Sequence, residues 1–374
     1  MAKVLIVGGG FGGVVAAESL AKKLGHDHEI TLVSRSRKFL FYPALVRLAF
    51  GKCEPDDIAF DIREAMIDRR VRFVEGEVAR IHPTERHITF ARGDFVGDMP
   101  YDFLILALGR RLRTEQVTGF FEHAHHLLNV RDAEKFGDAA RLFNQGHAVI
   151  GHCPGARMPI PVFEAAFALS RLLEECGKRD QCTITIVSNE SPDEMFGGIP
   201  MSEALNGPLA SHRIELVSDF AITQVTPNSL IADDGRKLSG DLTILIPPFG
   251  GPGALVGTGL TDTEGYVCVD TTMRVEGLER IYAAGDCVSF KGPKMGHMAV
   301  RQAEVAAENL VAEIEGRALT ANYDHDMMLV LDAGDESIFV HKDLWSDDEA
   351  NIHHSRFWAW AKRKQERYWK AKHA

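Results

Sequence analysis

A glycine-rich turn near the start of the chain constrains its fold more than any other feature. Residues 4–7 form an apolar run, and a G-x-G-x-x-G pattern follows at residues 8–13. The first glycine makes a tight turn, the second lets backbone approach a pyrophosphate, and the third lets a helix pack on a strand. The spacing of Ala16–Leu24 predicts a helix, and Glu29–Val33 a second strand. The segment therefore predicts a Rossmann-like unit that binds a dinucleotide.

The composition is that of an ordinary globular protein. With 374 residues, 45% of them hydrophobic, the chain can bury a large core and divide into two or three domains. A net charge of −11 argues against nucleic acid as a partner. Glycines interrupt the first apolar run too early for a signal peptide or membrane span, so we expect a cytoplasmic protein. The six cysteines show no C-x-x-C pair or zinc spacing, so free thiols and no metal are expected.

Strand and helix patterns alternate along most of the chain, which predicts an α/β fold. Residues 58–70 read as a helix, and Tyr101–Gly109 is an apolar strand that returns the chain to the first sheet. A second βαβ unit begins with the strand Ala148–Gly151 and the helix Val162–Cys176. We expect two Rossmann-like dinucleotide-binding domains and a small C-terminal tail domain. The first domain takes residues 1–112 and 259–320, the second 113–258, and the tail 321–374.

A second motif narrows the type of dinucleotide. Residues 280–286 read as a buried strand that ends in Gly285 and Asp286. The carboxylate of Asp286 could accept hydrogen bonds from ribityl hydroxyls. A long helix opens near His297, and its positive end could stabilise the anion that builds up on a reduced flavin. The helix and the carboxylate together favour FAD over NAD.

These motifs resemble those of the two-dinucleotide-binding-domain flavoproteins, and within them the sulfide:quinone oxidoreductases. The resemblance extends over nearly the whole chain, and it implies an FAD-dependent oxidoreductase. The residues that carry it are Gly8–Gly13, Phe41-Tyr42-Pro43, Gly51, Asp57–Phe60, Tyr101–Gly109, Pro161, Glu164, Pro247–Phe249, Ala283–Asp286 and Pro293-Lys294.

The expected FAD-binding residues come from both parts of the first domain. Where an acidic side chain usually meets the adenine ribose, this chain has Ser34 followed by Arg35. The alanine-threonine-glycine turn common in relatives reads Ala107-Leu108-Gly109, which removes one hydroxyl near the cofactor. We expect FAD to be bound by Gly8, Gly10, Phe11, Gly12, Gly13, Ser34, Arg35, Pro43, Val78, Ala107, Leu108, Gly109, Arg110, Gly285, Asp286, Lys294, Met295 and Gly296.

Three thiols that the resemblance implies are absent. Sulfide oxidation in the family relies on a cysteine pair beside the flavin, and the matching positions are Met158 and Leu329. A cysteine that bonds covalently to the flavin in many relatives aligns close to Asn129, so we expect non-covalent FAD. Cys153 could approach the flavin, although a buried thiol that serves only packing is the alternative. Sulfide oxidation by the usual route is therefore doubtful.

The second glycine pattern is degraded. It reads Gly151-His152-Cys153-Pro154-Gly155, so Cys153 replaces the middle glycine. A side chain there would obstruct the approach of backbone to a pyrophosphate, and Ser188 stands at the strand end where an acid is usual. This weakens NADH binding without excluding it. The loop resembles the sulfide:quinone branch more than the type II NADH:quinone oxidoreductases.

Glu164, Lys294 and Cys153 are the candidate catalytic residues. Related enzymes keep a glutamate near the reactive face of the flavin, and Glu164 starts the helix of the second unit. A partly buried carboxylate with a raised pKa can relay the protons that quinone reduction needs. An ammonium at Lys294, near the flavin C2 carbonyl, would favour the reduced anion. The alternatives are a helix-terminal charge for Glu164 and a solvated lysine for Lys294.

Residues 356–372 concentrate aromatic and basic side chains in one predicted helix, with seven basic residues against Glu366 alone. This pattern suits a peripheral contact with an anionic membrane surface, on the inner face of the cell membrane. The alternative is that Phe357, Trp358, Ala361 and Tyr368 dock onto the protein's own flavin domain or a symmetry partner.

Three functions stay open. The leading hypothesis is an FAD-dependent oxidoreductase that passes two electrons from an unidentified donor to a quinone or similar small acceptor. The second is a type II NADH:quinone oxidoreductase, and the third is a catalytically silent flavoprotein that acts as a redox sensor or assembly partner. A homodimer is compatible with each of them.

Overall fold

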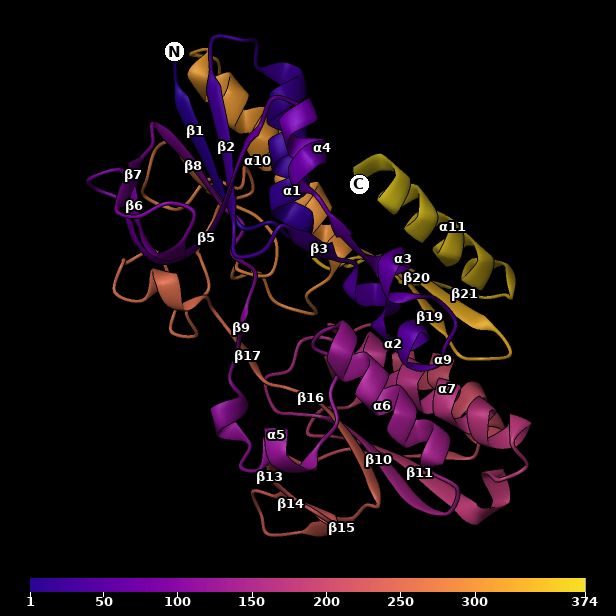
Figure 1. Cartoon of the computed structure of the whole chain (residues 1–374). Helices are drawn as coiled ribbons and strands as arrows, with labels where there is room; N and C mark the ends of the chain where they lie inside the picture. Colours follow the sequence, from indigo (N-terminus) through magenta and orange to yellow (C-terminus); the bar gives the residue numbers. More distant parts are fainter. Residues whose placement is uncertain (374) are drawn as a thin grey trace.

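Two parallel sheets organise the chain, which the computed structural model describes over residues 1–373 (Figure 1). The larger sheet is parallel through five strands and ends in two antiparallel ones. Its order is β18 (Ile281–Ala283), β8 (Phe103–Leu106), β1 (Lys3–Val7), β2 (Glu29–Ser34), β5 (Arg72–His82), β6 (His87–Gly93) and β7 (Asp98–Pro100).

The second sheet is parallel throughout and forms the core of the other Rossmann-like domain. Its order is β12 (Ile214–Val217), β11 (Cys182–Ser188), β10 (Gly146–His152) and β16 (Leu242–Ile246). An antiparallel sheet lies beside it, formed by β13 (Ile222–Thr226), β14 (Ser229–Ala232) and β15 (Lys237–Ser239). The expected α/β fold with two Rossmann-like domains is confirmed.

Helices pack against both sheets and bury their apolar faces. In the first domain, α1 (Phe11–Lys23) and α10 (Gly296–Ile314) lie side by side. In the second domain, the main helices are α6 (Val130–Leu142), α7 (Ile160–Glu175) and α9 (Met201–Ser211). The shorter elements are β3 (Lys38–Leu40), α2 (Leu45–Ala49), α3 (Pro55–Ile58), β4 (Ala59–Asp61), α4 (Arg63–Asp68), α5 (Phe120–His123), α8 (Pro192–Met195) and the 3-10 turns η1 (Tyr42–Ala44), η2 (Thr114–Gln116), η3 (Arg179–Gln181) and η4 (Gly253–Leu255).

The chain crosses between the two domains at a pair of short antiparallel strands. Strand β9 (Arg111–Leu112) leads into the second domain and pairs with β17 (Phe249–Gly250), which leads out of it. Leu255 already packs in the core of the first domain. The return therefore comes several residues before the expected boundary at residue 258.

The prediction of one helix over residues 58–70 is wrong. Helix α3 ends at Ile58, and the next three residues form β4, which pairs with β3. Phe60 of β4 packs on Phe39 of β3, with the ring centroids 5.2 Å apart. Aromatic side chains fit a paired strand better than an exposed helix, and this tertiary contact overrides the local helical pattern. The helix resumes only at α4.

A small antiparallel sheet and a long helix form the tail. The sheet contains β19 (Asp326–Asp332), β20 (Ser337–Asp343) and β21 (Asn351–His354), and α11 (Phe357–His373) follows. The inner face of α11 docks on the protein itself through Trp358 on Phe339, Lys362 on Glu164, Glu366 on Arg47, Trp369 on Phe11 and His373 on Glu18.

The docked face of α11 differs from the one that the sequence suggested. Of the aromatic residues expected to dock, Trp358 does so, whereas Phe357 and Tyr368 are exposed together with Trp360. The reason is that Lys362 and Glu366 find charged partners on the body, which sets the rotation of the helix. Among residues 1–373 the structure has no helix long and apolar enough to cross a membrane.

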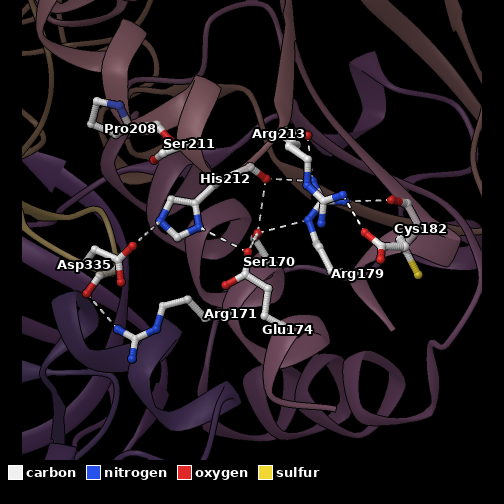
Figure 2. Close-up of polar contacts among 12 residues, drawn as sticks. Ser170, Arg171, Glu174, Arg179, Cys182, Pro208, Ser211, His212, Arg213 and Asp335 are labelled. Carbon is white, nitrogen blue, oxygen red and sulfur yellow. Dashed lines mark hydrogen bonds and ion pairs between the residues drawn. The ribbon is translucent and has the colours of Figure 1, made fainter. Parts of the chain in front are cut away.

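A buried arginine ties the parts of the second domain together (Figure 2). Arg179 donates hydrogen bonds to the carbonyl oxygens of Cys182 (2.6 Å), His212 (2.7 Å) and Arg213 (2.6 Å), and to Ser170 Oγ (3.1 Å). These bonds join the end of α9 to the start of β11. They also hold His212 between the carboxylates of Glu174 and Asp335, at 4.0 and 3.7 Å.

Candidate functional site

The turn between β1 and α1, with the glycines from Gly8 to Gly13, forms the surface that we call the cradle. The side of this turn that faces the rest of the protein has no room for side chains. Gly8 has φ +118°, and a Cβ atom built there would lie 1.9 Å from the carbonyl oxygen of Ala107. A Cβ on Gly13 would lie 1.7 Å from the carbonyl oxygen of Gly8. A Cβ on Gly10 meets no atom within 4 Å. The open side of the cradle is therefore at Gly10.

The start of α1 faces this open side. Gly10 is the N-cap residue, no side chain caps the helix, and its first turn contains no acidic residue. The first-turn N–H groups and the positive end of the helix dipole are thus available for an anionic group. Gly12 lies beside β18, because a Cβ there would be 3.4 Å from the carbonyl oxygen of Ala284.

Asp286 follows β18 and lies at the same edge of the sheet as the glycine turn. The neighbouring Gly285 has φ +85° and donates its N–H to Gln302 Oε1 at 2.7 Å, which fixes this bend. The carboxylate of Asp286 forms an ion pair with the guanidinium of Arg110, and the two side chains are only 17% and 14% exposed. A carboxylate held here can accept hydrogen bonds from hydroxyls in the cradle.

Lys294 is buried beside Asp286, so the alternative of a solvated lysine is not supported. The residue is 8% exposed. Its Nζ donates to the carbonyl oxygens of Val288 and Phe290, and lies 4.8 Å from the ring centroid of Tyr266. Burial, helped by the nearby charge of Arg157, lowers the pKa of Lys294 to about 7. The side chain of Lys294 can therefore exchange a proton near neutral pH: its ammonium form can lose one and its neutral amine can gain one.

A small pocket lies at the start of α10. Its walls include Asp286, Lys294 and Met295, all expected to bind the cofactor, together with the buried His325. Met295 is the N-cap residue of α10 and Gly296 is its first residue, with no side-chain cap. His325 Nε2 donates to the carbonyl oxygen of Lys291 (2.8 Å), and its Nδ1 shares a hydrogen bond with the hydroxyl of Tyr323 (3.1 Å). No local pattern in the sequence pointed to His325.

The other expected cofactor residues lie in different environments. The hydroxyl of Ser34 donates to the carbonyl oxygen of Ser36 at 2.7 Å, so it is engaged within the turn. Phe11 contacts Trp369 of α11, with the ring centroids 4.8 Å apart. Ala107 is buried, Val78, Leu108 and Gly109 are half-buried, and Arg35 and Pro43 are exposed.

Glu164 lies in the second turn of α7, not at its start, because the helix already begins at Ile160. The carboxylate is 6% exposed. It accepts hydrogen bonds from the backbone N–H of Asp332 (2.9 Å) and from Nζ of Lys362 (2.5 Å). Burial raises the pKa of Glu164, and the Lys362 ammonium opposes the rise. No local sequence pattern pairs Glu164 with Lys362, which lies 198 residues away in the chain.

Cys153 does not lie in an environment that activates a thiol. It is fully buried in an apolar cluster with Val149, Val187 and Leu245. Burial raises the pKa of its thiol well above the ordinary range. A nucleophilic cysteine needs the thiolate form, which this site disfavours. The packing alternative is therefore the one that the structure supports.

The loop after β10 differs from the cradle after β1. Three residues separate β1 from α1, whereas residues 153–159 separate β10 from α7. This longer loop reaches toward the first domain, where Arg157 donates to the carbonyl oxygens of Phe290 and Gly292. The side chain of Cys153 points into the core and not into the mouth of the loop. The loop length, more than the cysteine itself, distinguishes it from a tight dinucleotide turn.

Met158, Leu329 and Asn129, where the resemblance implies cysteines in relatives, are packing and capping residues in this chain. Met158 and Leu329 belong to one apolar cluster, in which Leu329 is buried. Asn129 is the N-cap of α6, and its Oδ1 accepts from the backbone N–H of Asp132 at 3.0 Å. Each of these three residues thus has a structural role in place of sulfur chemistry.

Comparison with known proteins agrees with the two-domain architecture and the cradle. The family model described as pyridine nucleotide-disulphide oxidoreductase matches residues 2–303, and the chain belongs to this family. Within it, the chain is like the sulfide:quinone oxidoreductases. It is 26% identical over 341 residues to the sulfide-quinone reductase of Aquifex aeolicus, covering 84% of this chain and 77% of the relative.

Two further comparisons extend this result. The chain is 24% identical over 371 residues to the type II NADH:quinone oxidoreductase of Haemophilus influenzae, covering 85% of this chain and 82% of the relative. Its fold matches the X-ray structure of the sulfide:quinone oxidoreductase from Aquifex aeolicus with a TM-score of 0.92 and 23% identity. That match covers 100% of this chain and 92% of the other.

The chain is therefore an FAD-dependent oxidoreductase. Its residues fit this cofactor, because the side-chain-free space at Gly10 faces the uncapped start of α1, where a diphosphate would be held. Asp286 would accept hydrogen bonds from the ribityl hydroxyls of bound FAD, and the uncapped start of α10 lies beside Lys294.

Proposed function

We propose that the enzyme passes two electrons from a donor other than sulfide, through non-covalently bound FAD, to a quinone. One observation carries the proposal: the chain has a cradle for FAD and a buried Glu164–Lys362 pair. At the positions where the resemblance implies the cysteine pair, it has Met158 and Leu329. Its relatives are named for different donors, sulfide and NADH, and for the same acceptor, quinone. The acceptor is thus the shared property on which the proposal rests.

Two residues supply the proton chemistry in this proposal. FAD, when bound, takes up and gives up two electrons. Reduction of a quinone also consumes two protons, and these must come from groups that exchange protons near neutral pH. Lys294 meets this requirement through its lowered pKa. Glu164 is held by Lys362 in a buried position, where its carboxyl can keep a proton more readily than an exposed one.

Fewer features of the chain indicate which molecule donates the electrons. The sulfide route needs two thiols that this chain lacks, and Cys153 is buried in an apolar cluster. NADH is the second candidate donor, favoured by the similarity to a type II NADH:quinone oxidoreductase. The long loop of residues 153–159 weighs against it.

An anaerobic titration of the FAD-loaded enzyme tests the donor. Sulfide, NADH and NADPH are added in turn while the visible flavin band is recorded. We expect little bleaching with sulfide, and bleaching by NADH would support the second candidate. Acid precipitation afterwards should leave the flavin in the supernatant, since no cysteine lies at Asn129 to hold it.

We also propose that the exposed face of α11 makes a peripheral contact with an anionic membrane surface. Phe357, Trp360 and Tyr368 are exposed on this helix, and Lys364 lies 5.2 Å from the ring centroid of Trp360. Exposed aromatic rings interleaved with basic residues suit the headgroup region. Such a contact would bring the enzyme close to a substrate dissolved in lipid.

A further inference from the structure

Arg110 follows the Ala107-Leu108-Gly109 turn directly, and its side chain contacts Asp286. Its guanidinium forms an ion pair with Asp286, the carboxylate that should receive the ribityl hydroxyls. Both side chains are largely withdrawn from solvent. Asp286 therefore has a charged partner that belongs to the protein itself.

Two aromatic rings hold the guanidinium without using its hydrogen-bond donors. The Cζ atom of Arg110 lies 4.2 Å from the ring centroid of Phe249 and 5.3 Å from that of Tyr42. Phe249 belongs to β17 and Tyr42 to η1, so one ring comes from each side of the site. Cation–π contacts of this kind fix the position of an arginine but leave its N–H groups free.

One of these N–H groups has no acceptor. Within residues 1–373, Nε of Arg110 is buried and makes no hydrogen bond. A buried unpaired donor is costly, and a native protein usually retains one where a ligand supplies the acceptor. The departure at Leu108 also removes a hydroxyl from the same turn. Arg110, two residues after Leu108, supplies a cationic donor in this part of the site.

The acceptor that suits this donor is a phosphate group. The strand end that carries Asp286 lies against the glycine turn, because a Cβ on Gly12 would be 3.4 Å from the carbonyl oxygen of Ala284. Arg110, paired with Asp286, is therefore next to the cradle of the diphosphate. Guanidinium groups bind phosphate oxygens through charge-assisted hydrogen bonds.

We propose that Arg110 is a binding residue for the diphosphate of FAD, and that its guanidinium exchanges Asp286 for phosphate oxygens when FAD binds. The guanidinium, held by Phe249 and Tyr42, donates to phosphate oxygens, and Asp286 is released to the ribityl hydroxyls. This inference rests on the FAD cradle and is independent of the identity of donor and acceptor.

Binding measurements on the apoprotein test the inference with two probes, FAD and ADP. ADP has the diphosphate but lacks the ribityl chain, so it separates the two contacts. We expect R110Q to weaken both probes by about tenfold or more, with a smaller salt dependence of binding. We expect D286N to weaken FAD by about tenfold but to bind ADP as tightly as the wild type or more tightly, because Arg110 is freed from its pair.

Two further variants control for charge and folding. R111Q removes the same charge one residue later, at an exposed arginine paired with Glu115, and should leave both affinities within about twofold. R110K keeps the charge without the planar fork and should retain part of the ADP affinity. Thermal unfolding of each apoprotein shows whether the variant is folded.

The inference is overturned if folded R110Q binds ADP as tightly as the wild type. It is also overturned if D286N weakens ADP as much as R110Q does, because the ion pair would then act only as a structural unit. Neither readout involves a quinone, so failure here is distinct from failure of the proposed activity.

Discussion

At the residue scale, we expect two glycines of the turn to have different roles: Gly13 is needed for folding, and Gly10 is needed for cofactor binding. A Cβ on Gly13 collides with the carbonyl oxygen of Gly8, whereas a Cβ on Gly10 meets open space at a φ of −85° that alanine accepts. We expect G13A to destabilise the apoprotein by about 2 kcal/mol or more. We expect G10A to leave its thermal unfolding unchanged but to weaken FAD binding by about tenfold or more. Equal loss of stability in both variants would contradict this assignment.

Lys294 gives the stability of the apoprotein a defined pH dependence. Its pKa in the folded state is about 7, below the ordinary value of 10.5. Between these two pH values the unfolded chain binds one more proton than the folded one, so stability rises with pH. We expect the stability of the wild type relative to K294M to increase from pH 7 to pH 10, by at most about 1.4 kcal/mol per pH unit. Denaturant unfolding of both proteins at several pH values measures this difference in stability. A difference that stays constant from about pH 7 to pH 10 would contradict the prediction.

At the element scale, Arg179 is the main polar tie within the second domain. It donates hydrogen bonds to the backbone carbonyls of Cys182, His212 and Arg213, of which that of His212 also accepts from Ser170 Oγ at 3.2 Å. We expect R179M to destabilise the protein by about 2–4 kcal/mol, because it leaves buried acceptors unpaired. The matched control is R213M, whose guanidinium pairs with Asp180 at the surface and should matter by less than about 1 kcal/mol. Comparable effects in the two variants would show that the buried bonds contribute little.

The elements that the sequence predicts well are those in which local pattern and burial agree. The turn from β1 to α1 and the strand β18 before Asp286 are of this kind, because each combines an apolar run with a glycine at a tight bend. The three residues of β4 were missed, because their conformation is set by pairing with β3. For the same reason the sequence does not predict the role of Lys362, and it predicts Arg110 as an FAD-binding residue without its ion pair to Asp286. Their partners, Glu164 and Asp286, are distant in sequence and are brought close only by the fold.

At the scale of the whole molecule, α11 has one face on the protein and one exposed face. We expect the wild type to sediment with vesicles of phosphatidylcholine and phosphatidylglycerol, less so at high salt. Replacing the exposed Phe357, Trp360 and Tyr368 by serine should reduce the bound fraction several-fold. L142S with V256S removes exposed apolar side chains from other elements and serves as the control. Equal binding by the two sets of variants would rule out this face of α11.

The central claim concerns the acceptor, and it can be tested without knowing the donor. The FAD-loaded enzyme is reduced anaerobically with a stoichiometric amount of dithionite and mixed with a soluble quinone in a stopped-flow instrument. The account predicts rapid return of the oxidised flavin spectrum, with one quinone reduced to quinol for each flavin. A flavin that stays reduced in the presence of excess quinone would contradict it.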